Sequence, residues 1–212
     1  MRLGGYQKST LSDFPGKTAA IVFTQGCNFR CPFCHNGRLL PGRTAPTESI
    51  SEEEVMGHLK RRAGVLQGLV ITGGEPTLQL DLVQFVERVK ELGYAVKLDT
   101  NGSRPEVLRV LFERGLLDYV AMDVKAPMER YDILTGVDSP KEAIRESIQL
   151  IAESGVSHHF RTTLVEALLS AEDLAALQLE IPKGSRYITQ KFIPDNALAV
   201  ELRGYQKLAL QA

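Results

Sequence analysis

The stretch TAAIVFTQGCNFRCPFCHN, residues 18–36, joins a β-strand pattern directly to three closely spaced cysteines. Residues 18–24 are apolar or β-branched, and the run is short, which is typical of a buried strand. Cys27, Cys31 and Cys34 follow at once. In α/β folds the functional loops lie at the carboxyl ends of the strands. The stretch therefore predicts an α/β fold with a thiol-rich site after its first parallel strand.

Similar strand patterns recur along the chain and are separated by amphipathic helical patterns. Further strands are expected at 69–72, 95–99, 119–124, 158–164 and 186–190. Helices are expected to begin at Ser51, Leu82, Pro105, Ser139 and Ser170, where Ser51 and Ser139 each open a capping box. This alternation predicts βαβ units with right-handed crossovers. Six units are too few for a closed eight-stranded barrel, so either an open partial barrel or an open doubly wound sheet is expected.

Length and composition limit the class of protein. The 212 residues, 43% hydrophobic and 24% charged, are ordinary for a single domain, expected to span 1–212 with 1–17 as an N-terminal extension and 192–212 as a C-terminal tail. The net charge of -1 and the scattered basic residues predict no nucleic-acid partner and no membrane-surface partner. A signal peptide and a membrane span are both missing, so a cytoplasmic location is expected. In that compartment the cysteines are expected to be ligands rather than disulfides.

Glycines and polar residues gather where the expected strands end. The sequence GGEP, residues 73–76, follows the second expected strand, and DTNG, residues 99–102, ends the third. Asp123 and Lys125 end the fourth. Because parallel strands present their carboxyl ends at one edge, these residues and the three cysteines are expected to share one site.

The cysteines alone leave two kinds of metal site open. Thiolates bind both iron–sulfur clusters and zinc. Three cysteines would leave one iron of a four-iron cluster without a protein ligand, which is useful only if something else binds there. The alternative is a structural zinc site with His35 as its fourth ligand. Structural zinc sites usually draw on two separate knuckles, and the sequence offers one.

The residues around the cysteines carry a family resemblance. GCNFRCPFCHN, residues 26–36, resembles the signature of the radical S-adenosylmethionine (SAM) superfamily, and the motifs at 73–76 and 99–102 resemble that family's downstream segments in the same order. The resemblance covers nearly the whole chain. It implies a partial (β/α)6 TIM-like barrel and a [4Fe-4S] cluster on Cys27, Cys31 and Cys34. It also implies reductive cleavage of SAM to a 5′-deoxyadenosyl radical, with no catalytic group beyond the cluster and SAM.

The same resemblance implies the residues that hold SAM. Phe33 would lie near the adenine, and the 73–76 segment near the methionine amino group. In activating enzymes of this family, the pair matching Asp123 and Lys125 helps hold SAM, and the aspartate can share a bound cation with Asp99. Arg161, Thr163 and Gln190 could line the barrel interior, whereas His158 and His159 are expected at the surface or in a turn. The implied SAM-binding residues are Phe33, Gly73, Gly74, Glu75, Pro76, Asp99, Thr100, Asn101, Asp123 and Lys125.

Two further features resemble one branch of the superfamily. Phe14-Pro15-Gly16 before the first expected strand, and Cys34-His35-Asn36 after it, are similar to glycyl-radical-enzyme activating enzymes, above all the activating proteins of anaerobic ribonucleoside-triphosphate reductase. That resemblance implies a glycyl radical enzyme as protein substrate and a flavodoxin or ferredoxin as electron donor. The chain departs from some activating enzymes, since it has no further cysteines for an inserted ferredoxin-like domain and no histidine after His159.

Two alternatives remain at this point. One is a small-molecule radical SAM enzyme such as 7-carboxy-7-deazaguanine synthase, which shares the small barrel and the GGEP segment. The other is a non-catalytic metal-binding module, which would need the cysteines but would leave the strand-end motifs without a role.

Overall fold

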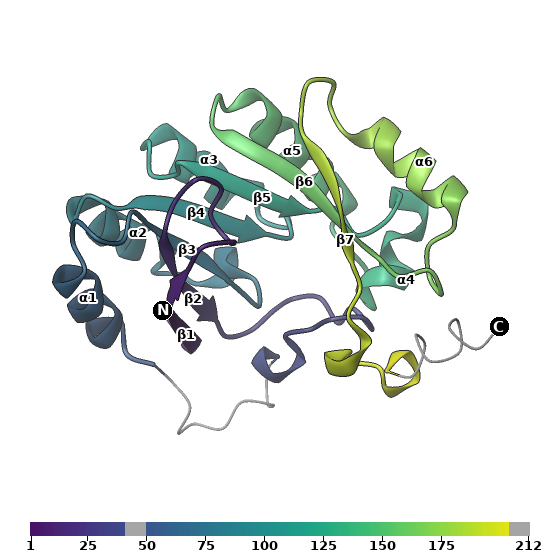
Figure 1. The fold of residues 1–212 in the computed structure, drawn as a ribbon. Coiled ribbons are helices and arrows are strands. Elements are labelled where there is room, and N and C mark those ends of the chain that lie inside the picture. Colours follow the sequence, from purple (N-terminus) through teal and green to yellow (C-terminus); the bar gives the residue numbers. More distant parts are fainter. Residues whose placement is uncertain (41–49, 204–212) are drawn as a thin grey trace.

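A seven-stranded sheet forms the centre of the protein, and its strands lie side by side in chain order (Figure 1). The computed structural model describes residues 1–40 and 50–203, so the last part of the expected C-terminal tail lies outside the described residues. The strands are β1 (Leu3–Thr10), β2 (Ala19–Thr24), β3 (Gly68–Gly73), β4 (Ala95–Thr100), β5 (Tyr119–Asp123), β6 (Ser157–Leu164) and β7 (Tyr187–Lys191).

Strands β2 to β7 are parallel and match the six expected strands. The sheet is curved but not closed, with β1 and β7 at its two edges, as in a partial barrel. Strand β1 is an addition, because it pairs antiparallel with β2. Its sequence contains Gly4 and Gly5 and no clean alternation of apolar and polar residues, so the strand pattern was missing from the sequence. Backbone pairing with β2 holds it in the sheet.

Helices line the outer side of the curved sheet (Figure 1). They are α1 (Glu52–Arg61), α2 (Leu82–Glu91), α3 (Pro105–Glu113), α4 (Tyr131–Thr135), α5 (Lys141–Glu153) and α6 (Ala171–Glu180), with short 3-10 turns η1 (Gly37–Leu39), η3 (Pro76–Leu78), η4 (Met128–Arg130), η5 (Pro194–Asn196) and η6 (Val200–Leu202). None of the helices in the described part of the chain has the length and apolar composition needed to cross a membrane.

The helix starts agree with the sequence except at Ser139, although at Ser51 only one half of the expected capping box is present, the bond from the Glu54 amide to the Ser51 hydroxyl. Ser51 caps α1, and Ser170 forms a capping box with Asp173 at the start of α6. The capping box expected at Ser139 is wrong, because Pro140 occupies the N-cap position of α5. The Ser139 hydroxyl lies 2.6 Å from the Thr135 hydroxyl at the end of α4 instead. The turn between α4 and α5 therefore competes for the side chain that would have capped the helix.

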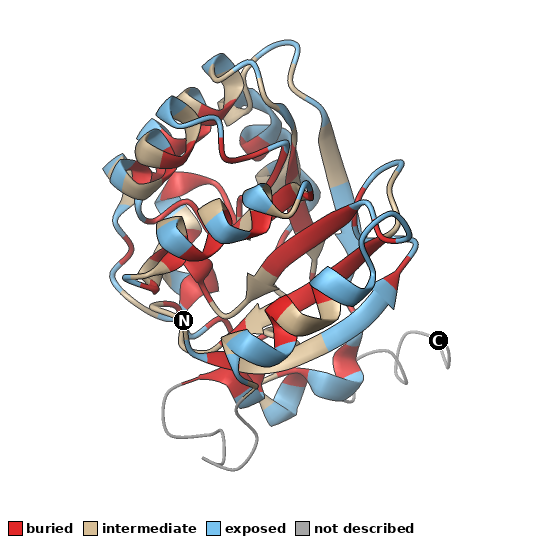
Figure 2. Ribbon diagram, turned by 90° about the vertical axis from the view of Figure 1, so that its left-hand side faces the viewer, coloured by how far each residue is buried: buried red, intermediate tan, exposed pale blue. Residues whose placement is uncertain are grey.

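Alternate strand residues face two different apolar clusters. The larger cluster lies between the sheet and the helices and contains, among others, Val22, Ile71 and Leu98. Figure 2 shows this burial along the strands and the inner sides of the helices. The smaller cluster lies on the opposite, inner face of the sheet and contains Phe14, Ala19, Ile21, Val70 and Tyr119. The inner face is thus apolar at its amino-terminal end.

Phe14 anchors the loop between β1 and β2 in this smaller cluster. Its ring is 2% exposed and packs edge-on against Tyr119, with 6.1 Å between ring centroids. A Cβ atom on Gly68 would lie 2.8 Å from the Phe14 ring, so the strand approaches the ring closely. Phe14 of the Phe-Pro-Gly segment therefore has a packing role at the amino-terminal end of the partial barrel, opposite the end where the polar motifs lie.

Candidate active site

One cavity of about 340 Å³ gathers the residues that the sequence singled out. All the expected ligand and SAM-binding residues line it except Pro76, which is buried at the start of η3. Arg161, Thr163 and Gln190 line the same cavity, as expected for residues of the barrel interior. The cavity runs along the inner face of the sheet from Ile21 and Val70 to the carboxyl ends of the strands. The residues singled out from the sequence line its carboxyl-end part, as the rule used on the sequence predicts. Their roles in binding SAM stay predictions.

The three cysteines lie on the loop between β2 and η1. Cys31 is buried and the other two are half-buried. Burial, with smaller contributions from nearby acidic groups, raises the pKa of Cys27 to about 12. Burial also raises the pKa of Cys31 to about 11. Such thiols ionise when a metal binds them, because the metal charge stabilises the thiolate. Three thiols facing one cavity fit a cluster that keeps an open position toward a ligand.

His35 holds residues 192–203 against the cysteine loop. Its ring stacks on Phe192 with 5.5 Å between centroids, and its Nε2 accepts a hydrogen bond of 3.3 Å from the Ile193 backbone amide. Burial lowers the pKa of His35, which favours the neutral ring that can accept this bond. The Ala199 amide also donates to the Pro32 carbonyl at 2.8 Å. Residues 192–203 thus cover the loop, and the Nε2 lone pair is directed at a backbone amide rather than at a zinc ion.

The glycine pair brings the turn after β3 against the cysteine loop. Gly73 has a φ of +114°, and a Cβ atom on Gly74 would lie 2.0 Å from the Gly26 carbonyl oxygen. The Glu75 amide donates to that same oxygen at 2.8 Å. Asn36 adds a second connection, since its Nδ2 donates to the Gly73 carbonyl at 3.0 Å. Close backbone contact requires glycine at both positions.

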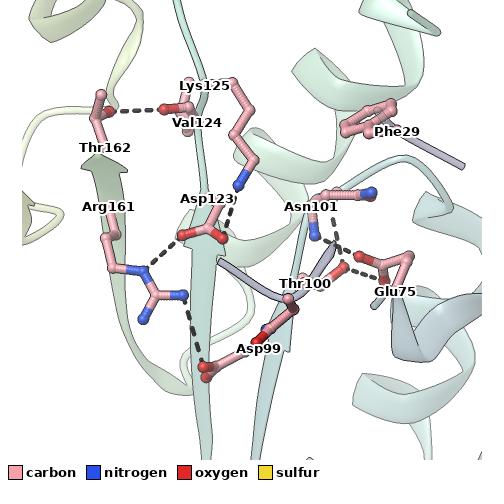
Figure 3. Close-up of polar contacts among 12 residues, drawn as sticks. Phe29, Glu75, Asp99, Thr100, Asn101, Asp123, Val124, Lys125, Arg161 and Thr162 are labelled. Carbon is pink, nitrogen blue, oxygen red and sulfur yellow. Dashed lines mark hydrogen bonds and ion pairs between the residues drawn. The ribbon is translucent and has the colours of Figure 1, made fainter. Parts of the chain in front are cut away.

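Glu75 joins the ends of β3 and β4 through a buried carboxylate (Figure 3). Its Oε1 accepts hydrogen bonds from the amide and hydroxyl of Thr77, at 3.0 and 2.5 Å, and from the Thr100 hydroxyl at 2.8 Å. Its Oε2 accepts from the Asn101 amide at 2.7 Å. Burial raises the pKa of Glu75, while these four donors act in the opposite direction. The carboxylate therefore fixes the loop that carries Thr100 and Asn101, two of the residues implied to hold SAM.

A chain of ion pairs crosses the inner face from β4 to the end of β5. Asp123 accepts from the Arg161 Nε at 2.6 Å and from the Lys125 Nζ at 2.9 Å. The second carboxylate, Asp99, contacts Lys97 and lies 3.6 Å from the Arg161 Nη2. Burial alone would raise the pKa of Asp123, but the charges of Arg161 and Lys125 outweigh it and hold the pKa below its usual range. Burial alone would likewise lower the pKa of Lys125, and Asp123 raises it instead.

Some residues of the site were not found from the sequence. Phe29 and Thr72 line the cavity, and Asn28 accepts a hydrogen bond of 2.9 Å from Asn101. An asparagine or phenylalanine between two cysteines carries no pattern of its own, although the position of Asn28 inside the motif was a usable signal. The expectation for His159 is wrong, since it lies on β6, is 6% exposed, and pairs through Nδ1 with the Tyr119 hydroxyl at 2.9 Å. Its strand alternates inward at that residue.

Known proteins are similar to this chain in sequence, over most of its length or over part of it. A protein of Methanocaldococcus jannaschii named "Putative glycyl-radical enzyme activating enzyme" is 34% identical over 196 residues, which cover 90% of this chain and 80% of the relative. A "Probable GTP 3',8-cyclase" of Thermococcus kodakarensis is 34% identical over 64% of this chain, a match that spans 43% of the cyclase.

The fold is also similar to solved structures. Streptococcus suis SuiB, solved bound to its precursor peptide SuiA, superposes with a TM-score of 0.65 at 16% identity. The match covers 90% of this chain and 45% of the SuiB chain, and at this identity it supports the fold alone. The sequence profile of the radical SAM superfamily matches residues 21–172, which include the cysteine loop, the glycine pair, and both aspartates of the ion-pair chain. The chain belongs to the radical SAM superfamily.

Proposed function

We propose that this protein is a glycyl-radical-enzyme activating enzyme that carries a [4Fe-4S] cluster on Cys27, Cys31 and Cys34. The observation that carries the proposal is the convergence of the cysteine loop and the polar ends of β3, β4 and β5 on one cavity. When bound, the cluster and SAM together supply one-electron reduction of the sulfonium and a 5′-deoxyadenosyl radical. The 34% identical relative matched along most of both chains supports the activating role.

The chain's own residues position the ligand. Phe33 is 4% exposed and lines the cavity, where its ring offers a stacking surface for adenine. Glu75 and Asn101 fix the loop after β4, so its donors and acceptors are already oriented before SAM binds. Residues 192–203 cover the outer side of the cysteine loop through Phe192 and His35.

The proposed protein substrate is a glycyl radical enzyme, and anaerobic ribonucleotide reductase is the first candidate. A flavodoxin or ferredoxin is the proposed electron donor. A small-molecule substrate is the second candidate, because the cyclase of Thermococcus kodakarensis is equally identical over the part that aligns. That match spans less than half of the cyclase, so the remainder of that protein has no aligned counterpart in this chain.

The test begins with SAM cleavage. The protein is purified without oxygen, its cluster is rebuilt, and dithionite and SAM are added, after which 5′-deoxyadenosine is quantified. Cys31→Ala is the matched control, since it removes one buried ligand with only a small change in side-chain size. Product from the parent and none from the variant supports the cluster assignment. Stoichiometric zinc with no retained iron contradicts it.

The partner is then tested with a label. Anaerobic ribonucleotide reductase is produced in cells fed dideuterated glycine and is mixed with the reconstituted protein, SAM and dithionite. Deuterium in the 5′-deoxyadenosine, together with a carbon-centred radical on the reductase by EPR, supports hydrogen abstraction from glycine. Unlabelled 5′-deoxyadenosine with no radical on the reductase rules out this partner and leaves the superfamily assignment intact.

A further inference from the structure

Arg161 connects two carboxylates that come from two different strands. Arg161 extends from β6, and its Nε donates a hydrogen bond of 2.6 Å to the Oδ1 of Asp123, the last residue of β5. Its Nη2 lies 3.6 Å from Asp99 Oδ2 on β4. Figure 3 shows the guanidinium between the two carboxylates, with Lys125 on the far side of Asp123. This is the position at which the family resemblance implies a bound cation.

The sheet register explains why the guanidinium reaches both groups. Asp123 and Arg161 are direct partners in the parallel pair of β5 and β6. On β4, Asp99 is the partner of Ala121, which precedes Asp123 by two residues and shares its face of the sheet. A methyl group at Ala121 leaves room for the long arginine side chain to reach Asp99 diagonally. The contact is therefore set by the strands and not by a loop.

Each carboxylate also has a second cation from the protein. Asp99 contacts Lys97, which is 3% exposed, and Asp123 contacts Lys125 at 2.9 Å. The five groups comprise three cations and two carboxylates, which leaves one positive charge in excess. A metal ion placed between the carboxylates would lie against the guanidinium and would be repelled by it. The residues present do not fit a shared cation.

We infer that Arg161 takes the place of the cation that the family resemblance implies between Asp99 and Asp123, so this site forms without a metal ion beside SAM. A guanidinium is always charged and is attached to the strand, so it cannot dissociate when the salt changes. Arg161 is thus a positioning residue that fixes the Asp123 carboxylate and, through it, Lys125 at the wall of the cavity. The inference rests on the proposed SAM-binding role of this cavity.

The first test uses ligand-free protein. Thermal unfolding is followed in choline, sodium, potassium and magnesium chlorides at equal ionic strength. The parent should melt at the same temperature in all four. Arg161→Ala removes the guanidinium and opens a gap between two carboxylates. Its melting temperature should rise by roughly 3–6 °C when a metal cation or methylguanidinium is present at about ten times its dissociation constant. Arg161→Lys, which keeps the charge, should show no such rise.

A surface arginine provides the matched control. Arg145→Ala removes an exposed guanidinium paired with Glu142 on α5, away from the carboxylate pair of the barrel interior. It should respond to the four salts as the parent does. A rise common to both alanine variants would mean that the cation acts elsewhere on the surface, and would overturn the inference.

The second readout is SAM affinity of the cluster-loaded protein by calorimetry. The parent should bind SAM equally in choline and metal chlorides, whereas Arg161→Ala should bind it at least about tenfold more weakly in choline and recover part of the loss with the cation. Dependence of the parent on one cation, in either readout, overturns the inference. If Arg161→Ala does not fold in any salt, the melting temperatures of the parent in the four salts still test the inference, because dependence on one cation would overturn it. If SAM does not bind at all, the proposed function fails while the thermal result still tests Arg161.

Discussion

Substituting alanine for Gly74 tests whether the turn after β3 must touch the cysteine loop. The added Cβ atom would lie 2.0 Å from the Gly26 carbonyl oxygen and 2.7 Å from the Gly26 carbonyl carbon. Real contacts of this kind are rarely below 3.0 Å, so the two backbones must separate by about 1 Å. Neither is the end of a flexible side chain, and Cys27 follows Gly26 directly. The displacement should therefore reach the first cysteine.

The expected cost is the sum of two effects. Overpacking of this kind costs about 1–3 kcal/mol. Separation also breaks the 2.8 Å hydrogen bond from the Glu75 amide to Gly26, at about 1 kcal/mol. A loss of about 3 kcal/mol corresponds to a melting temperature lower by about 6–12 °C for a chain of this size. The variant should also retain less iron after anaerobic reconstitution, because its cysteine loop is shifted.

The assay is thermal unfolding by circular dichroism together with iron analysis of the reconstituted protein. Gly57→Ala is the matched control, since its Cβ would meet only the flexible end of Arg61, at 3.4 Å in α1. Alanine favours the helix there by about 1 kcal/mol, so this variant should melt about 2–4 °C higher than the parent. If Gly74→Ala melts within about 2 °C of the parent and holds the same iron, the close contact does not constrain the loop.

Three further substitutions probe other parts of the structure. Ser170→Ala removes the capping box of α6 and should lower the melting temperature by about 2–4 °C, and an unchanged value would mean that the cap contributes nothing. Phe14→Ala empties a site that is 2% exposed and should cost about 3–5 kcal/mol in urea unfolding, so a loss below about 1 kcal/mol would contradict its packing role. Asp123→Asn should make the free energy of unfolding depend less steeply on pH in the acid range. Because the folded pKa of Asp123 lies below its usual value, its ion pairs stabilise the protein above pH of about 4, and this contribution is lost as the pH falls toward the folded pKa. Equal slopes for parent and variant between pH of about 5 and 3, measured by urea titration, would show that the pairs carry no such energy.

The sequence predicted the parallel strands and the position of the site because both follow from local patterns. Helix α2, for example, shows apolar residues at helical spacing, with Phe85 and Val89 buried. Strand β1 was missed because its pairing depends on the backbone of β2 rather than on its own side chains. The capping box at Ser139 failed because a tertiary neighbour, Thr135, competes for the hydroxyl.

Within the site, too, the positions of the residues followed from local sequence patterns, whereas the contacts between their side chains did not. Parallel strands present their carboxyl ends at one edge of the sheet, and this rule was enough to place the cysteines, Gly73 and Asp123 together. The partners of each side chain could not be read from spacing. The Glu75 carboxylate accepts from the backbone amide of Asn101 because both are buried at neighbouring strand ends. Arg161 reaches Asp99 through a register that only the assembled sheet defines.

The order of the strands has a consequence for synthesis on the ribosome. Each strand pairs with the one made just before it, so every βα unit can dock as it emerges, without waiting for distant parts of the chain. The cysteine loop is made early, whereas residues 192–203, which cover it through Phe192 and Ala199, are made after all seven strands. In a nascent chain the cysteine loop is therefore without this cover until residues 192–203 are made and pack against it through Phe192 and Ala199.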